Sequence, residues 1–118
     1  MTPAPNPVAK QAVVMLERAG KKNQAPIWLA ASRRLGSPAA TKVEVNVGKI
    51  SKVTSSGGAV FVPGKVLGTG IIDKKVEIGA FSYSASARAK IEASGGSAMT
   101  VEEFLARHPN GSGVKLVE

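Results

Sequence analysis

Glycine and proline recur along this chain and divide its apolar segments. The sequence has 13 glycines and 7 prolines in 118 residues, and no apolar run approaches the ~20 residues that cross a bilayer. The N-terminus, MTPAPNPVAKQ, lacks the basic and apolar regions of a signal peptide. We therefore expect one soluble, unexported domain of mixed α/β class over residues 1–118.

The basic first part of the chain, residues 1–56, has mainly helical patterns. A helix is predicted to begin at Pro7, with Asn6 as its cap, and to end at Gly20. A second helix is predicted from Pro26 to the GSP sequence that breaks its apolar stripe. These two helices would open the domain.

The segment TKVEVNVGKISKV is ambiguous. Its valines alternate as in a strand, yet Val43, Val47 and Ile50 also share a helical stripe. We expect a short extended lead-in and then a helix capped by Asn46, with lysines on its outer side.

The second part, residues 57–118, has the short apolar runs and glycine turns of a mixed α/β region. AVFVP, VEIGAFSY and VKLV are predicted strands. Ser84 is expected to cap a helix that continues to about Ala93. Thr100 and Glu103 have the spacing of a capping box and predict a last short helix.

Positive charge is concentrated in the first two thirds of the chain. There are 16 Lys and Arg against 8 acids, a net charge of +8. Up to Lys75 there are 12 basic and 3 acidic residues, which gives +9; the remainder has 4 and 5, which gives −1. Such an uneven charge favours nucleic acid or an anionic surface as the partner, over a basic face kept for solubility.

The glycine-rich stretch VPGKVLGTG suggests a phosphate-binding loop, but its spacing fails. A Walker loop ending in Gly64-Lys65 needs glycine where Ala59 stands and a hydroxyl residue where Val66 stands. A dinucleotide fingerprint fails as well, because Asp73 occupies the place of its third glycine. Tight turns at Pro63-Gly64 and at residues 68–70 are the simpler interpretation.

A catalytic site is hard to assemble from the residue types present, and so is a metal site. His108 is the only histidine, lies in a turn-rich loop and has no visible partner, so we expect a solvated side chain. Glu102 and Glu103 fit the first turn of a helix. With no cysteine and one histidine, metal ligation has only scattered carboxylates. We therefore expect no catalytic residue and no metal.

Nucleic acid is therefore the best-supported ligand. The chain has one Trp, one Tyr and three Phe, too few for a sheet that stacks single-stranded bases, so binding should depend on charge and on the shape of folded RNA or a duplex. Trp28 and Phe61 lie in apolar patterns and are expected in the core. Arg33 and Arg34 could bind phosphates or simply complement a helix dipole.

Several ordered motifs carry a family resemblance. VPGKVLGTG, VEIGAFSYSASARAKIEASGG and TVEEFLARHPNGSGVKLV resemble the archaeal and eukaryotic large-subunit ribosomal protein L eighteen-e, and more distantly the C-terminal domain of bacterial large-subunit protein fifteen. PIWLAASRRL and KVEVNVGKISK fit the same family. The resemblance covers the chain from about Val8, and the absence of a long C-terminal continuation favours an archaeal member.

The resemblance implies a structural, non-catalytic ribosomal protein of the cytoplasm that has no cofactor. It also implies an irregular superhelix of β-β-α units. It implies large-subunit ribosomal RNA and neighbouring ribosomal proteins as partners, with no membrane and no small-molecule substrate. An assembly factor, an RNA chaperone or a nucleotide-binding enzyme using Gly64-Lys65 are the alternatives. The cations expected to hold RNA phosphates are Lys21, Lys22, Arg33, Arg34, Lys42, Lys49, Lys52 and Lys65.

Overall fold

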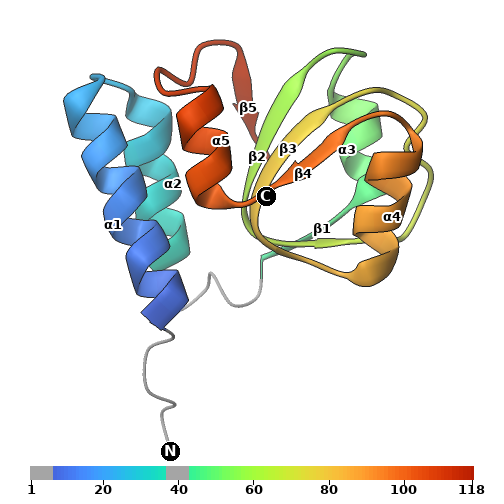
Figure 1. The fold of residues 1–118 in the computed structure, drawn as a ribbon, viewed down its shortest axis with the longest axis horizontal. Helices are drawn as coiled ribbons and strands as arrows, with labels where there is room; N and C mark the ends of the chain where they lie inside the picture. The colour runs from blue at the N-terminus through green and yellow to red at the C-terminus, as the bar shows by residue number, and fades with distance from the viewer. Residues whose placement is uncertain (1–6, 37–42) are drawn as a thin grey trace, which may run out of the picture.

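Short helices and strands alternate along most of the chain in the computed structural model, which describes residues 7–36 and 43–118 (Figure 1). The mixed α/β prediction is confirmed. In chain order the elements are α1 (Pro7–Lys22), α2 (Pro26–Gly36), β1 (Glu44–Asn46), α3 (Val47–Val53), β2 (Ala59–Leu67), β3 (Glu77–Tyr83), α4 (Ala85–Ala93), β4 (Ser97–Met99), α5 (Val101–Arg107) and β5 (Val114–Leu116).

One sheet organises the domain, and every strand pair in it is parallel. The order is β1-β2-β3-β4, and β5 also pairs with β2. Since β3 occupies one edge of β2, β1 and β5 share the other: β5 pairs with residues 59–61 and β1 with residues 65–67. Strand β2 is thus the centre of the sheet.

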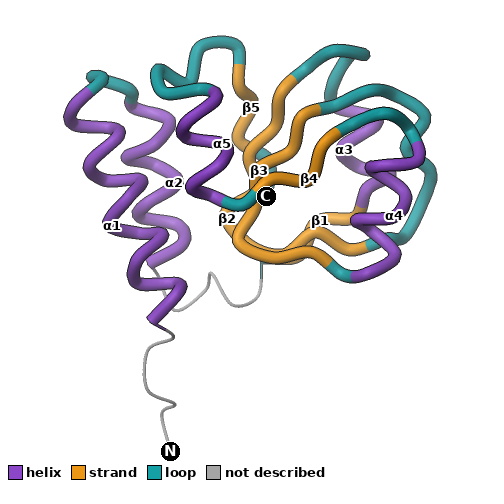
Figure 2. Tube along the Cα trace, viewed as in Figure 1, coloured by secondary structure: helices purple, strands orange, loops and turns teal. Residues whose placement is uncertain are grey.

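Helices cover both faces of this sheet (Figure 2). Helices α1, α2 and α5 lie on one side, and α3 and α4 on the other. Consecutive residues of β2 accordingly enter different cores: Val60 and Val62 pack with α3 and α4, while Phe61 packs toward α1, α2 and α5. A strand buried on both faces has a continuous apolar run, which explains the AVFV sequence.

Three aromatic rings fill the core beneath α1, α2 and α5. Trp28 packs edge-on against Phe61 and Phe104, with ring centroids 5.5 and 5.9 Å apart. The Trp28 indole N–H donates to the carbonyl of Pro109 at 2.9 Å, so its polar atom is satisfied inside the core. The prediction that Trp28 and Phe61 are core residues is confirmed.

The local helix signals are mostly confirmed. The Ser84 hydroxyl accepts from the amide of Ala87, and Thr100 and Glu103 form the predicted capping box. The predicted stop at Gly20 is wrong, because α1 continues to Lys22 and Gly20 instead faces α2, where a Cβ would lie 2.7 Å from Leu29 Cγ. The proposed cap Asn6 lies outside the described residues.

Asn46 occupies the N-cap position of α3, but its side chain makes no capping hydrogen bond. The amide of Gly48, one of the donors such a cap would satisfy, donates instead to the carbonyl of Thr69 at 3.1 Å. The predicted extended lead-in and helix are confirmed, and Asn46 stands at the predicted N-cap position, but its side chain does not cap the helix. No helix within residues 7–36 or 43–118 has the length and apolar content to span a membrane.

Candidate nucleic-acid interface

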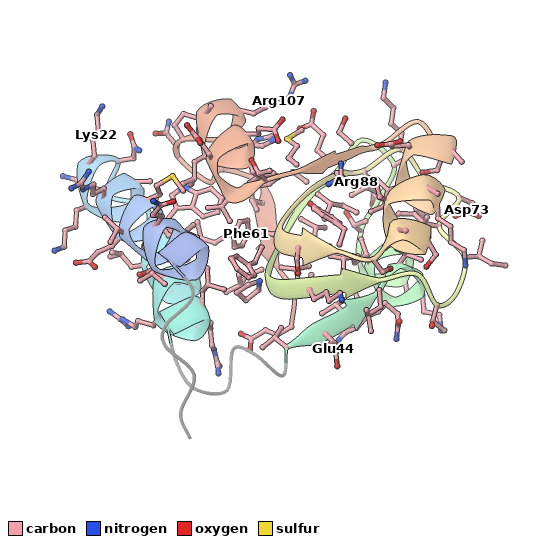
Figure 3. The ribbon with its side chains drawn as sticks, turned by 60° about the horizontal axis from the view of Figure 1, so that its bottom comes forward. Lys22, Glu44, Phe61, Asp73, Arg88 and Arg107 are labelled. Carbon is pink, nitrogen blue, oxygen red and sulfur yellow. The ribbon has the colours of Figure 1, made fainter. Side chains whose placement is uncertain are left out.

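The predicted basic pairs of the first two helices lie at opposite ends of a helical hairpin. Lys21 and Lys22 end α1, and Arg33 and Arg34 lie in the last turn of α2. Because α2 runs back along α1, the two pairs are separated by the length of the hairpin; Figure 3 shows Lys22 at its tip. All four side chains are exposed, as a phosphate contact requires.

Lys21 already has an acidic partner. Its Nζ donates to Glu17 Oε1 at 2.9 Å, one helical turn earlier. That hydrogen bond, together with the Lys21 charge, holds the pKa of Glu17 below its ordinary value. An exposed pair of this kind stabilises little, so Lys21 can exchange Glu17 for a phosphate.

Helix α3 and strand β2 supply the other described cations. Lys49 and Lys52 are exposed on α3, whose Val47 and Ile50 are buried beneath them, so the predicted orientation of the two lysines is confirmed. Lys65 is the exposed residue of a strand that is otherwise buried or half-buried. These lysines therefore project from rigid elements.

Arg34 and Lys49 come together around Glu118. The Nε of Arg34 lies 3.0 Å from Glu118 Oε1, and the Nζ of Lys49 donates to the Glu118 carbonyl at 2.6 Å. Helices α2 and α3 belong to opposite faces of the sheet, so a residue just beyond strand β5 connects the two layers. One acidic residue thus brings together two cations that the sequence predicts separately.

The predicted set does not form one uniform patch. Lys42 lies outside the described residues, and the remaining seven members are exposed. The structure brings Arg34 and Lys49 together and separates the Lys21-Lys22 pair from the Arg33-Arg34 pair.

Two further lysines bind the protein's own backbone. Lys74 Nζ donates to the carbonyls of Ser51 and Thr54, at 2.5 and 3.0 Å, and Lys115 Nζ donates to the carbonyl of Val53. These carbonyls lie at the end of α3 and lack helical partners, so the two lysines complete its C-terminus. No sequence signal identifies this role, because the partners are far apart in the chain.

Arg88 is a cation that the sequence analysis did not single out. Its guanidinium lies 5.3 Å from the centre of the Tyr83 ring. The Tyr83 hydroxyl lies 2.6 Å from the carbonyl of Met99, and burial raises the pKa of this phenol. Arg88 is exposed and held over an ordered ring, so it offers a further positive charge outside the predicted set.

Pro63 and Gly64 do not form a turn between strands, so that prediction is wrong. They lie inside β2, where the register with β3 shifts between Val62 and Lys65. A Cβ on Gly64 would lie 2.4 Å from the carbonyl oxygen of Val43, so glycine permits the neighbouring segment to approach. The adjacent Lys65 amide donates to that same oxygen at 3.0 Å. This amide is not available to a phosphate.

The prediction of a solvated, unpartnered His108 is also wrong. His108 follows α5, its ring lies 4.7 Å from that of Phe104, and its Nε2 lies 2.5 Å from Glu77 Oε2. Arg107 Nε donates to the other carboxylate oxygen at 2.8 Å. Burial would raise the pKa of Glu77, but the hydrogen bonds from His108 and Arg107 outweigh it and lower that pKa.

This cluster fixes α5 to the start of β3. The carboxylate of Glu77 is bound on both oxygens. Within the described residues, no group of three or more His, Asp or Glu side chains could hold a metal ion.

Comparison with known proteins identifies the family. Residues 28–99 match the family described as ribosomal proteins 50S-L15 and 50S-L18e and their 60S counterpart. The large ribosomal subunit protein eL18 of Methanococcus maripaludis is 44% identical over 112 residues, covering 95% of this chain and 93% of that protein. Its counterpart in Archaeoglobus fulgidus is 45% identical over 113 residues, covering 96% and 95%. These names describe a structural ribosomal protein and not an enzyme, and the chain belongs to the family of ribosomal proteins 50S-L15 and 50S-L18e.

Proposed function

We propose that this chain is a structural constituent of the large ribosomal subunit and braces folded ribosomal RNA through its Lys and Arg side chains. It would act in the cytoplasm, beside other proteins of the subunit. The observation that carries the RNA contact is the exposure of all seven described cations of the predicted set. RNA segments that repel one another approach more closely when such side chains neutralise their phosphates.

The rigid supports of these cations favour a structural role. Lys49 and Lys52 belong to a helix whose other face is buried, and Lys65 belongs to the central strand. A cation on a fixed backbone loses less conformational entropy when it meets a phosphate than one on a loose tail. The pairs at the two ends of the α1-α2 hairpin would contact separate RNA segments.

Salt-dependent binding of the purified chain to a large-subunit ribosomal RNA transcript tests the phosphate contacts. Replacing Lys52 by Gln should lower the slope of log K against log salt by about one unit, since each phosphate contact contributes nearly one released counterion. Lys75→Gln is the matched control: Lys75 lies outside the predicted set. Equal slopes for the two variants would contradict a contact at Lys52.

Sedimentation of a native lysate tests the ribosomal assignment itself. The chain should comigrate with mature large subunits in stoichiometric amount and remain bound after a high-salt wash. Substoichiometric association with precursor particles would favour an assembly factor or RNA chaperone instead. Sedimentation near the top of the gradient would contradict both roles.

A further inference from the structure

The loop between β2 and β3, residues 68–76, presents a large apolar side chain to solvent. Ile71 is 78% exposed, whereas the other exposed large hydrophobic residues among those described, Val14 and Val53, are 39% and 36% exposed. Scattered apolar side chains are normal on protein surfaces. The surroundings of Ile71 are what distinguish it.

The backbone before Ile71 is held on two sides. Gly48 and Gly70 touch: a Cβ on Gly70 would lie 2.8 Å from Gly48 Cα, and Gly70 has a φ of +93°. Lys90 Nζ also donates to the carbonyls of Gly68 and Gly70, at 2.5 and 2.8 Å. The loop therefore cannot fold Ile71 inward without breaking these contacts.

The backbone after Ile71 is held as well. Ile72 is buried in the core cluster of α3 and α4. Asp73 Oδ1 accepts from the Ser51 hydroxyl at 3.2 Å, and Lys74 binds the end of α3. Both neighbours of Ile71 in the chain are thus constrained, and its exposure is imposed by the fold.

Two surface hollows flank the exposed side chain. One, of about 550 Å³, lies between Ile71 and α3 and includes Lys52 and Lys74; the other, of about 380 Å³, lies between Ile71 and α4 and includes Lys90. Ile71 therefore forms a ridge between two concave surfaces. A ridge of this kind suits a partner that has a groove with raised sides.

The charge around the ridge decides between the possible partners. Lys52, Lys74 and Lys90 surround Ile71, and Asp73 is the one acid lining the two hollows. Lysine is depleted at the cores of protein–protein interfaces, while phosphate contacts require it. The wide, shallow minor groove of an RNA helix presents sugar surfaces between two phosphate backbones. Its shape and charge are complementary to this ridge.

We propose that Ile71 packs into the minor groove of a ribosomal RNA helix, with Lys52 facing a phosphate backbone. Lys74 and Lys90, whose Nζ atoms hold carbonyls of the protein itself, add positive charge beside the groove. This inference rests on the proposed function and adds a contact site to it. The fixed loop supplies the apolar contact without an ordering step, and Lys52, which also belongs to the predicted basic set, supplies charge on the α3 side.

Photochemical crosslinking tests the contact in assembled particles. The full chain carrying p-benzoylphenylalanine in place of Ile71 is incorporated into large-subunit cores washed free of the corresponding protein, and irradiated. A crosslink to ribosomal RNA is expected. A crosslink to protein alone, or none, would overturn the proposal. The same probe at Val14, on α1, is the control for proximity. If the unsubstituted chain fails to enter the cores, the proposed function fails instead.

Binding to the ribosomal RNA transcript gives a second, independent test. Ile71→Ala should weaken binding about tenfold, from the lost burial of apolar surface, and Ile71→Leu should restore most of it. The slope of log K against log salt should stay unchanged, because no counterion contact is removed. Unchanged affinity for Ile71→Ala would overturn the proposal, while a normal salt slope would still support the phosphate contacts. Equal urea midpoints would show that the variant folds normally.

Discussion

Replacing Gly79 by alanine should destabilise the domain through a collision with α5. Gly79 lies in β3, and a Cβ built there would be 2.4 Å from Phe104 Cγ and 2.7 Å from Phe104 Cβ. These atoms are close to the backbone of α5, so rotating the ring cannot remove the overlap. Either β3 or α5 must move.

The sign of the change in the free energy of unfolding distinguishes this collision from the usual effect of replacing glycine by alanine. Where alanine fits, replacing glycine stabilises a protein by about 0.4–1 kcal/mol, because the unfolded chain loses freedom. Overpacking a dense core costs about 1–3 kcal/mol. We therefore expect the free energy of unfolding to fall by about 1–2 kcal/mol, measured by urea denaturation with an unchanged m value.

A double-mutant cycle with Phe104→Ala tests the assigned partner. That substitution alone should cost about 3–5 kcal/mol, since the ring is fully buried against Trp28 and Phe61. Without the ring, part of the collision disappears, so the double variant should lose less than the sum of the single losses. Gly36→Ala is the control, because its Cβ would lie 3.6 Å from Val13. A stabilising Gly79→Ala, or additive losses, would refute the collision.

Three further predictions concern contacts made by single side chains. Thr100→Ala removes the capping box and should cost about 1 kcal/mol in urea denaturation. Glu77→Gln should be less stable than the wild type at neutral pH. Because the pKa of Glu77 in the folded protein is lowered from 4.5, the difference in unfolding free energy between the two proteins should shrink as the pH falls through 4.5 and below. Denaturation at a series of pH values measures this difference. Lys74→Met removes the donor at the end of α3 and should raise amide exchange in that helix.

Matched variants make these three results interpretable. Thr69→Ala changes an exposed loop threonine and should leave stability within about 0.5 kcal/mol, whereas an equal loss for Thr100→Ala and Thr69→Ala would contradict the cap. Glu92→Gln alters an exposed carboxylate on α4, and a similar pH dependence there would contradict the role of Glu77. Lys75→Met is the control for Lys74→Met. Equal rates of amide hydrogen exchange in α3 for these two variants would contradict the capping contact of Lys74.

Signals within a few residues predicted the local structure well. Ser84 and the Thr100-Glu103 pair cap their helices as expected, because a cap and its amide are separated by one turn. The buried positions of Trp28 and Phe61 followed from apolar patterns. Such features depend on the chain nearby and are visible without a structure.

Interactions between distant segments were not predictable in the same way. Gly64 resembles a turn glycine in sequence, yet it lies within β2. Val43, which directly precedes β1, approaches the Gly64 backbone there. His108 has no acidic neighbour in its own loop, and Glu77 reaches it from β3. Strand β4, too short for a clear pattern, is defined by its pairing with β3.

The candidate interface was predictable by residue type but not by arrangement. Charge segregation identified exposed cations such as Arg34 and Lys49, but no spacing indicates that Glu118 would bring them together. Ile71 follows a glycine-rich turn, and only the tertiary contacts of that loop show that the side chain is held outward.

The position of β5 has a consequence for how a newly made chain matures. On the edge of β2 opposite β3, residues 59–61 pair with residues 114–116, which are far away in the sequence. Parallel pairing over such separations is slow, and unpaired strand edges promote aggregation. While residues 114–116 are still inside the exit tunnel of a translating ribosome, the chain therefore has an open edge on its central strand. We expect chaperones to protect the nascent chain at this stage.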